Sequence, residues 1–169
     1  MWHWLDESCK RSQDDMQIIR TEAQHLDLIA PLFDAYRQFY RQASDLAAAR
    51  QYIEQRLQND DAVIFLAVKP TRSGVQALGF VQLYPSLASI PMKPIWILYD
   101  LFVAPSARKL GVGRALMDRA TQLAKETGAD ALILETAADN HTAQRLYEKL
   151  GYKKDDVFYR YALSLSHVR

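Results

Sequence analysis

The sequence contains little of what marks several classes of protein. It has a single cysteine, Cys9, so no internal disulfide can form and a reducing compartment is expected. The longest apolar run, Ala62 to Val68, is far shorter than the roughly 20 residues that cross a bilayer. The opening residues have no basic segment followed by an apolar stretch, the pattern of a signal peptide. These features predict a cytoplasmic protein that does not work in a membrane.

An excess of charge of one sign is also missing. Lys and Arg number 21 against 20 Asp and Glu, which leaves a formal net charge of +1. Because nucleic-acid binding needs a strong positive field, no nucleic-acid partner is predicted. The four histidines are dispersed without the spacing of metal ligands, so no metal site is predicted. The chain has 169 residues, of which 49% are apolar, and this length and composition are typical of one globular domain.

Hydrophobic periodicity divides the chain into strands and helices. Residues 1–15 show no periodicity and are expected to form a variable N-terminal extension, whereas 16–169 form a single domain. Strands are expected over 16–21, 62–68, 75–84, 95–103, 131–136 and 157–165, and helices over 28–40, 46–58, 113–127 and 140–150. Loops are expected at Pro70, Pro85, Pro91 and Pro94.

The order β-αα-βββ-α-β-α-β predicts an α/β (α+β) fold. The strand, helix and strand between Ile95 and Thr136 form a βαβ unit, which requires parallel neighbours. The short polar link after Val68 favours an antiparallel hairpin. We therefore expect a mixed, mostly antiparallel central sheet with helices on both faces.

A basic loop with two glycines joins the strand over 95–103 to the next helix. Gly111 and Gly113 allow close backbone approach, and the first amides of the helix are unpaired at its positive end. An anion such as pyrophosphate fits there, with Arg108, Lys109 and Arg114 as further donors. Glycines that serve only packing are the alternative.

Two nucleotide-binding motifs do not match this loop. A Walker A loop needs Gly-Lys-Ser/Thr before the helix, and that sequence is absent. A dinucleotide fingerprint needs a third glycine where Leu116 stands. Both nucleotide interpretations are therefore disfavoured.

Two segments instead carry a resemblance to a known family. Arg108-Lys-Leu-Gly-Val-Gly resembles the Arg/Gln-x-x-Gly-x-Gly/Ala signature of the GNAT superfamily of N-acetyltransferases. The segment Asn140-His-Thr-Ala-Gln-Arg-Leu-Tyr-Glu-Lys-Leu-Gly-Tyr is similar to its second signature, Asn-x-x-Ala-x-x-Leu-Tyr-x-x-x-Gly-Phe/Tyr. The element order from about Met16 to Leu165 also matches. The resemblance implies the acyl-CoA N-acyltransferase fold, with the polyamine- or histone-acetylating branch as the narrower match.

The resemblance also implies a cosubstrate and the residues that hold it. Acetyl-CoA is the expected acetyl donor, without a metal. Its pyrophosphate is expected against Arg108, Lys109, Leu110, Gly111, Val112, Gly113 and Arg114. In the family the preceding strand carries a bulge and splays from the next strand, and pantetheine binds its main chain. This role corresponds to the backbone of Leu101, Phe102 and Val103, and one amide there is expected to polarise the thioester carbonyl.

Two residues of the second signature have implied roles. Tyr147 corresponds to the tyrosine that protonates the departing CoA thiolate, and Asn140 to a cofactor contact. A phenol suits an acid, because its ordinary pKa near 10 keeps it protonated at neutral pH. Tyr147 also falls at helical spacing with core residues, and Asn140 is also a natural N-cap.

The general base stays open at this point. Many members carry a Glu where this sequence has Ile97 or Tyr99, so a direct glutamate base is in doubt. Asp100 is the nearest carboxylate and the candidate, with Glu135 or an ordered water as alternatives.

The resemblance predicts direct transfer, in a ternary complex, to a small-molecule amine or a basic protein tail. The acceptor is expected near the two early helices, where Tyr36, Tyr40, Asp34 and Asp45 are candidates for the lining. Family members often pair through their C-terminal strands, so a homodimer is compatible. The competing interpretation is a non-catalytic module that binds or senses acyl-CoA on the same fold.

Overall fold

The computed structural model describes residues 16–165, so the expected extension over 1–15, with Cys9, lies outside the described residues. The chain divides into two compact units, the first ending at Glu135 and the second starting at Thr136. The single-domain expectation for 16–169 stays a prediction.

In the first unit the elements are β1 (Gln17–Arg20), the 3-10 helix η2 (Ala23–His25), α1 (Leu26–Phe39), α2 (Leu46–Asn59), β2 (Val63–Thr71), β3 (Gly74–Ala88), β4 (Lys93–Val103), the 3-10 helix η3 (Pro105–Ala107), α3 (Val112–Glu126) and β5 (Ala131–Leu134). The second unit contains α4 (His141–Lys149).

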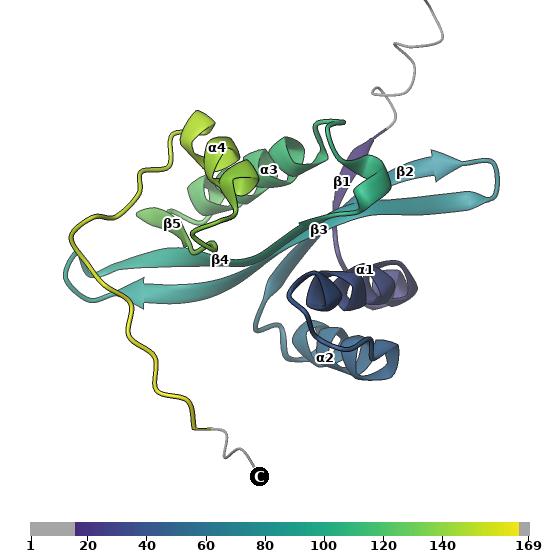
Figure 1. Ribbon diagram of the computed structural model, residues 1–169, viewed down its shortest axis with the longest axis horizontal. Helices are drawn as coiled ribbons and strands as arrows, with labels where there is room; N and C mark the ends of the chain where they lie inside the picture. The colour runs from purple at the N-terminus through teal and green to yellow at the C-terminus, as the bar shows by residue number, and fades with distance from the viewer. Residues whose placement is uncertain (1–15, 166–169) are drawn as a thin grey trace, which may run out of the picture. The chain divides into compact units, whose positions relative to one another are not determined.

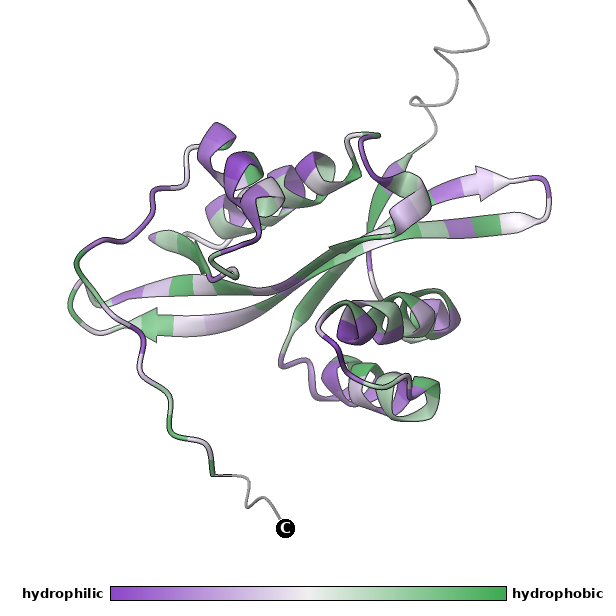
Figure 2. Ribbon diagram, in the orientation of Figure 1, coloured by the Kyte–Doolittle hydropathy of each residue, from purple (hydrophilic) through white to green (hydrophobic). Residues whose placement is uncertain are grey.

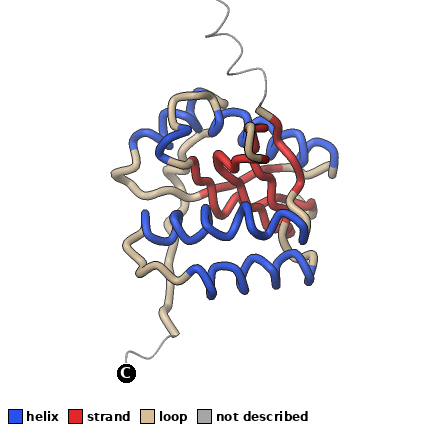
Figure 3. The backbone as a smooth tube through the Cα atoms, turned by 90° about the vertical axis from the view of Figure 1, so that its right-hand side faces the viewer, coloured by secondary structure: helices blue, strands red, loops and turns tan. Residues whose placement is uncertain are grey.

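The five strands of the first unit pair in the order β1-β2-β3-β4-β5. The first three pairs are antiparallel, and β4 with β5 is parallel. Helices α1 and α2 lie side by side on one face of this sheet, and α3 covers the other (Figures 1 and 3). The predicted α/β fold class, a mixed and mostly antiparallel sheet with helices on both faces, is confirmed.

The core forms where the central strands meet these helices. Helix α1 buries Leu26, Ile29, Ala30 and Phe33, which recur at helical spacing on one face. They pack with apolar side chains of β2 and β3, and Figure 2 shows the apolar residues concentrated along these central strands. Helix α3 buries a second stripe against the opposite face, made of Val112, Leu116, Met117, Ala120, Leu123 and Ala124.

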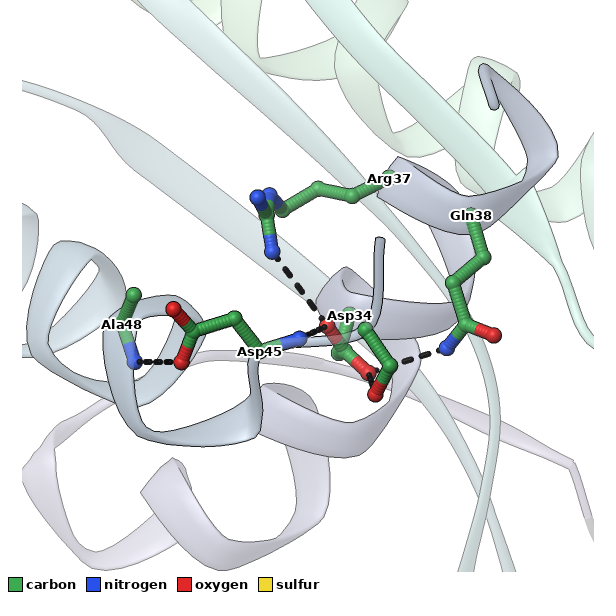
Figure 4. Close-up of polar contacts among 6 residues, drawn as sticks. Asp34, Arg37, Gln38, Asp45 and Ala48 are labelled. Carbon is green, nitrogen blue, oxygen red and sulfur yellow. Dashed lines mark hydrogen bonds and ion pairs between the residues drawn. The ribbon is translucent and has the colours of Figure 1, made fainter. Parts of the chain in front are cut away.

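A buried carboxylate fixes the link between α1 and α2 (Figure 4). Asp34 accepts hydrogen bonds from the hydroxyl of Ser44, at 2.6 Å, and from the backbone N–H of Asp45, at 2.8 Å. Gln38 and Arg37 donate to the same carboxylate. These hydrogen bonds, that of Ser44 first, lower the pKa of Asp34 below its ordinary value. Asp34 and Asp45, both expected near the acceptor, therefore have structural roles here, since the Asp45 side chain also caps α2.

Three of the prolines expected in loops lie inside strands. Pro94 is the second residue of β4 and pairs with Leu87 of β3. Pro70 is in β2 and Pro85 is in β3, although proline cannot donate a ladder hydrogen bond. Pairing of β1 with β2 ends at Val68, and pairing of β2 with β3 ends at Leu83. Pro70 and Pro85 therefore lie where their strand has one neighbour only, and an edge position tolerates the missing N–H. The β3–β4 hairpin is correspondingly longer than predicted.

Strand β4 changes its partners midway. Its parallel pairing with β5 covers only the four residues from Ile95 to Leu98. The register with β3 then shifts, since Leu83 faces Leu98 and Gln82 faces Asp100, which leaves Tyr99 as the extra residue of a bulge. Among the described strands, none pairs with the other edge of β4 beyond Leu98. The bulge implied by the family resemblance is present, and beyond Leu98 the outer edge of β4 is unpaired among the described strands.

In the second unit the predicted helix is present, whereas the predicted strand over 157–165 is absent. Helix α4 begins after Asn140, whose side chain accepts a hydrogen bond from the N–H of Ala143, and Gly151 follows the helix with φ of 90°. The side chains over 157–165 are exposed, and Asp155 accepts the N–H groups of Val157 and Phe158. Alternation indicates a propensity, but a strand exists only when its backbone is paired with another strand.

Candidate active site

The glycine loop is built as a turn from β4 into α3. Gly111 is the N-cap of α3 with φ of 81°, a left-handed conformation that favours glycine, and no side chain caps this helix end. The first intrahelical bond runs from the N–H of Ala115 to the carbonyl of Gly111. The amides of Val112, Gly113 and Arg114 therefore lie in the first turn without an intrahelical acceptor. This uncapped, positive helix end suits an anion.

The side chains of the loop differ in what they can offer. Arg108 donates through Nε to the carbonyl of Val103, at 3.4 Å, and Arg114 lies 3.5 Å from Asp118 in an exposed ion pair. Lys109 is exposed and has φ of 64°. Val112 is fully buried, so only its backbone can meet a ligand, and Leu110 is half exposed. The loop thus offers backbone amides together with three cations at the surface.

Only alternate residues of β4 direct their backbone N–H and carbonyl groups to its unpaired outer edge. The N–H of Ala104 donates to the carbonyl of Leu78 on β3. Because hydrogen-bonding directions alternate along a strand, Phe102 also directs its N–H and carbonyl toward β3, whereas Leu101 and Val103 direct theirs to the open edge. Phe102 is moreover a buried core residue. Of the three residues predicted to hold pantetheine, Leu101 and Val103 have the suitable backbone orientation.

Asp100 lies at the bulge in a buried polar network. Its carboxylate accepts a hydrogen bond from Gln82 Nε2, at 2.7 Å, and another from the Tyr36 side chain. Only 7% of Asp100 is exposed, and burial raises the pKa of this carboxyl despite the two hydrogen bonds. A carboxyl of this kind holds a proton more readily than an exposed one. Glu135, the alternative base, is exposed next to β5.

The network extends to residues that sequence reasoning did not find. Gln82 also donates to the Tyr84 hydroxyl, at 2.8 Å, and this hydroxyl shares a hydrogen bond of 2.7 Å with that of Tyr52 on α2. Burial, with the neighbouring Tyr52 hydroxyl, raises the pKa of Tyr84 above its ordinary value. The only signal in the sequence is a glutamine inside the apolar run that forms β3.

The residues of the second signature lie in the second unit. Tyr147 is 9% exposed, and its ring centroid is 5.9 Å from that of Tyr152. Asn140 acts as the predicted N-cap of α4. The role of Tyr147 toward the thiolate, and that of Asn140 toward the cofactor, stay predictions.

One hollow of the first unit lies away from these residues. It has a volume of about 240 Å³ and is lined mainly by Pro85, Leu87, Pro94, Ile95 and Trp96, at the hairpin end of β3 and β4. Its lining contains no titratable side chain. Across residues 16–165, no three His, Cys, Asp or Glu side chains gather closely enough to hold a metal ion. None of the helices in this range has the length and apolar character needed to cross a membrane.

Comparisons with known proteins agree with this geometry. The Acetyltransferase (GNAT) family model matches residues 29–152. The chain is 43% identical over 150 residues to the uncharacterized N-acetyltransferase YhfO of Bacillus subtilis, covering 89% of this chain and 98% of that protein. The D-amino-acid N-acetyltransferase of Saccharomyces cerevisiae is 38% identical over 84 residues, covering 50% of this chain and 52% of that protein.

A solved structure extends the match to three dimensions. The crystal structure of a probable acetyltransferase superposes with a TM-score of 0.82 and 40% identity, covering 89% of this chain and 99% of that one. The chain therefore belongs to the acetyltransferase (GNAT) family. It is an acyltransferase enzyme, with N-acetyltransferase activity.

Proposed function

We propose that the protein transfers an acetyl group from acetyl-CoA to a primary amine, directly in a ternary complex. The observation that carries this proposal is the uncapped start of α3, reached through a glycine loop from a strand whose outer edge is open. An open strand edge can pair with an extended amide-bearing arm, and a helix start can bind a diphosphate. CoA has both groups in series.

The residues present fit CoA group by group. The diphosphate would bind the amides of Val112, Gly113 and Arg114, with Arg108 and Lys109 nearby. Gly111 supports this fit, because a Cβ added there meets no protein atom within 4 Å, which indicates open space beside the loop. The pantetheine amides would pair with the backbone of Leu101 and Val103. We expect Asn140 to add a further contact to the cofactor.

The chemistry then needs a base, an oxyanion donor and an acid. The amine nitrogen attacks the acetyl carbonyl carbon, the new C–N bond forms, and the C–S bond breaks. An amide of the β4 edge would stabilise the oxyanion. Asp100 would accept the proton that the amine loses, directly or through ordered water, and its raised pKa supports this role. Tyr147 would protonate the departing thiolate, so no covalent enzyme intermediate is required.

The acceptor class is proposed from the relatives. A relative named for acetylating D-amino acids supports a small-molecule amine, and a relative named N-alpha-acetyltransferase 30 supports a protein terminus as the second candidate. A cytoplasmic location and a homodimer stay predictions.

Thiol release from acetyl-CoA, measured with a panel of primary amines, tests the proposal. We expect release only when an amine is present, together with an acetylated amine in the product mixture. CoA binding without thiol release from any amine would instead support the acyl-CoA sensing module. Stabilisation by ATP or NAD, but not by CoA, would contradict both functions.

A further inference from the structure

One polar atom in the buried network, the side-chain oxygen of Gln82, has no hydrogen-bond partner among the described residues. Gln82 is fully buried on β3, and its Nε2 donates to both Asp100 and the Tyr84 hydroxyl. The oxygen without a partner is Oε1 of the same side chain. A buried acceptor without a partner is costly, and native structures contain few of them. The position of Gln82 therefore requires a donor from elsewhere.

The setting indicates what kind of donor this is. The amide of Gln82 is held from both sides, by the carboxylate of Asp100 and by the Tyr84 hydroxyl, which is itself fixed by Tyr52. Oε1 and the Asp100 carboxylate thus belong to one rigid group of acceptors on the face of the sheet toward α1 and α2. Hydrogen-bond acceptors next to a carboxylate match the several N–H groups of an ammonium or amine.

We infer that Gln82 Oε1 and the Asp100 carboxylate together form the subsite that binds the N–H groups of the acceptor amine. This inference rests on the proposed acetyl transfer and names a binding residue, Gln82, for it. Both acceptors are covered in this structure, so binding has to part the tyrosines around them. Tyr36 and Tyr84 are partly buried, whereas Tyr52, 37% exposed, and Tyr99, 62% exposed and packed on Tyr84, reach solvent most.

The charges available limit the acceptor to one ammonium group. Two carboxylates are buried among residues 16–165, Asp100 and Asp34. The oxygens of Asp34 already accept four hydrogen bonds, including one from Arg37, so they cannot neutralise a substrate. A second ammonium close to the first would be buried without a counter-charge, which is strongly unfavourable.

The surroundings of Asp100 favour an apolar arm on that amine. The Tyr36 side chain that bonds Asp100 lies with its ring centroid 5.8 Å from that of Phe80 and 6.1 Å from that of Phe102. Aromatic rings attract both a cation and an apolar chain. We therefore assign the acceptor to primary monoamines with an alkyl or aromatic arm, rather than to the polyamine class suggested by sequence resemblance.

Two matched amines test the substrate class on the wild-type enzyme. Butylamine and trimethylenediamine have the same number of non-hydrogen atoms but differ by one amino group. At neutral pH we expect kcat/KM for butylamine to exceed that for trimethylenediamine by about tenfold or more, with phenylethylamine at least as good as butylamine. A diamine preferred over butylamine would overturn the assignment.

A substitution tests the residue itself. Gln82→Met keeps the length of the side chain but removes Oε1, so the KM for butylamine should rise about tenfold or more while the KM for acetyl-CoA stays unchanged. The matched control is Gln76→Met, at an exposed position of the same strand, which should change neither constant. If Gln82→Met fails to fold, Tyr84→Phe removes one anchor of Gln82 and should raise the amine KM by a smaller factor.

The outcomes separate this inference from the proposed function. An unchanged amine KM in Gln82→Met would show that Oε1 meets no substrate, and would overturn the subsite alone. Equal rises in the amine and acetyl-CoA KM values would indicate a structural role and would also overturn it. A wild-type enzyme that releases no thiol with any amine would overturn the acetyl transfer on which the subsite rests.

Discussion

Gly79 is the position where a single methyl group should disturb the link between the sheet and the cofactor site. A Cβ added there would lie 2.6 Å from the carbonyl oxygen of Phe102, 3.2 Å from Cα of Val103 and 3.3 Å from Cγ1 of Val112. Atoms of this kind pack at about 3.5–4.0 Å, so β4 would have to shift by about 1 Å. Overpacking of this kind costs about 1–3 kcal/mol.

The effect of Gly79→Ala can be measured as a change in Tm and as a change in the affinity for CoA. For a chain of this size, each kcal/mol lowers Tm by roughly 2–4 °C, so Gly79→Ala should melt about 2–12 °C below the wild type. The atoms displaced belong to the backbone of β4 at Phe102 and Val103 and to Val112, the first residue of α3. If about 1 kcal/mol of the strain falls on the cofactor site, the affinity for CoA measured by isothermal titration should drop about fivefold.

Gly74→Ala provides the control for this experiment. Gly74 is the first residue of β3, directly after the β2–β3 turn, with φ of 133°, and a Cβ there meets nothing within 4 Å. This variant should lose stability through backbone strain while its CoA affinity stays at the wild-type value. A Gly79→Ala protein that melts lower but binds CoA as the wild type does would refute the connection from β4 to the cofactor site.

Three further predictions concern single side chains. Asp34→Asn should flatten the dependence of the free energy of unfolding on pH. Because the folded-state pKa of Asp34 is lowered, the stability that its carboxylate contributes is present above the unfolded-state pKa of 3.8 and is lost as pH falls below it. Denaturant titrations at neutral and acidic pH measure this difference. Asp100→Asn should raise the free energy of unfolding at neutral pH, because a carboxyl whose folded-state pKa is raised costs stability as pH rises from 3.8 through the folded-state pKa. The same substitution should lower kcat, and a variant with the wild-type kcat would exclude Asp100 as the base. Tyr147→Phe should lower kcat about a hundredfold with little change in CoA affinity, measured by thiol release and titration, and an unchanged kcat would leave Tyr147 as a core residue.

The sequence alone predicted the features that depend on short local patterns. The glycine loop, the start of α3 and the N-cap Asn140 all follow from residue types at fixed spacing. The mixed sheet, with β2 and β3 antiparallel and β4 and β5 parallel, followed from the alternation of strands and helices and from the short link between β2 and β3. Each of these features is encoded by elements that follow one another along the chain, so no contact between distant segments has to be known.

Features set by pairing between distant residues could not be predicted. Phe39 is an apolar residue of α1, yet it is 54% exposed, because the helix turns Ile29 and Phe33 to the sheet instead. The network around Gln82 exists only because the bulge at Tyr99 brings Asp100 opposite Gln82. No local pattern in either strand encodes that register.

The most direct test of the central claim is a crystal structure of the protein with CoA. The account predicts the diphosphate oxygens about 3 Å from the amide nitrogens of Val112, Gly113 and Arg114, with pantetheine along Leu101 and Val103. A diphosphate bound elsewhere, or a loop whose amides meet only protein side chains, would contradict it.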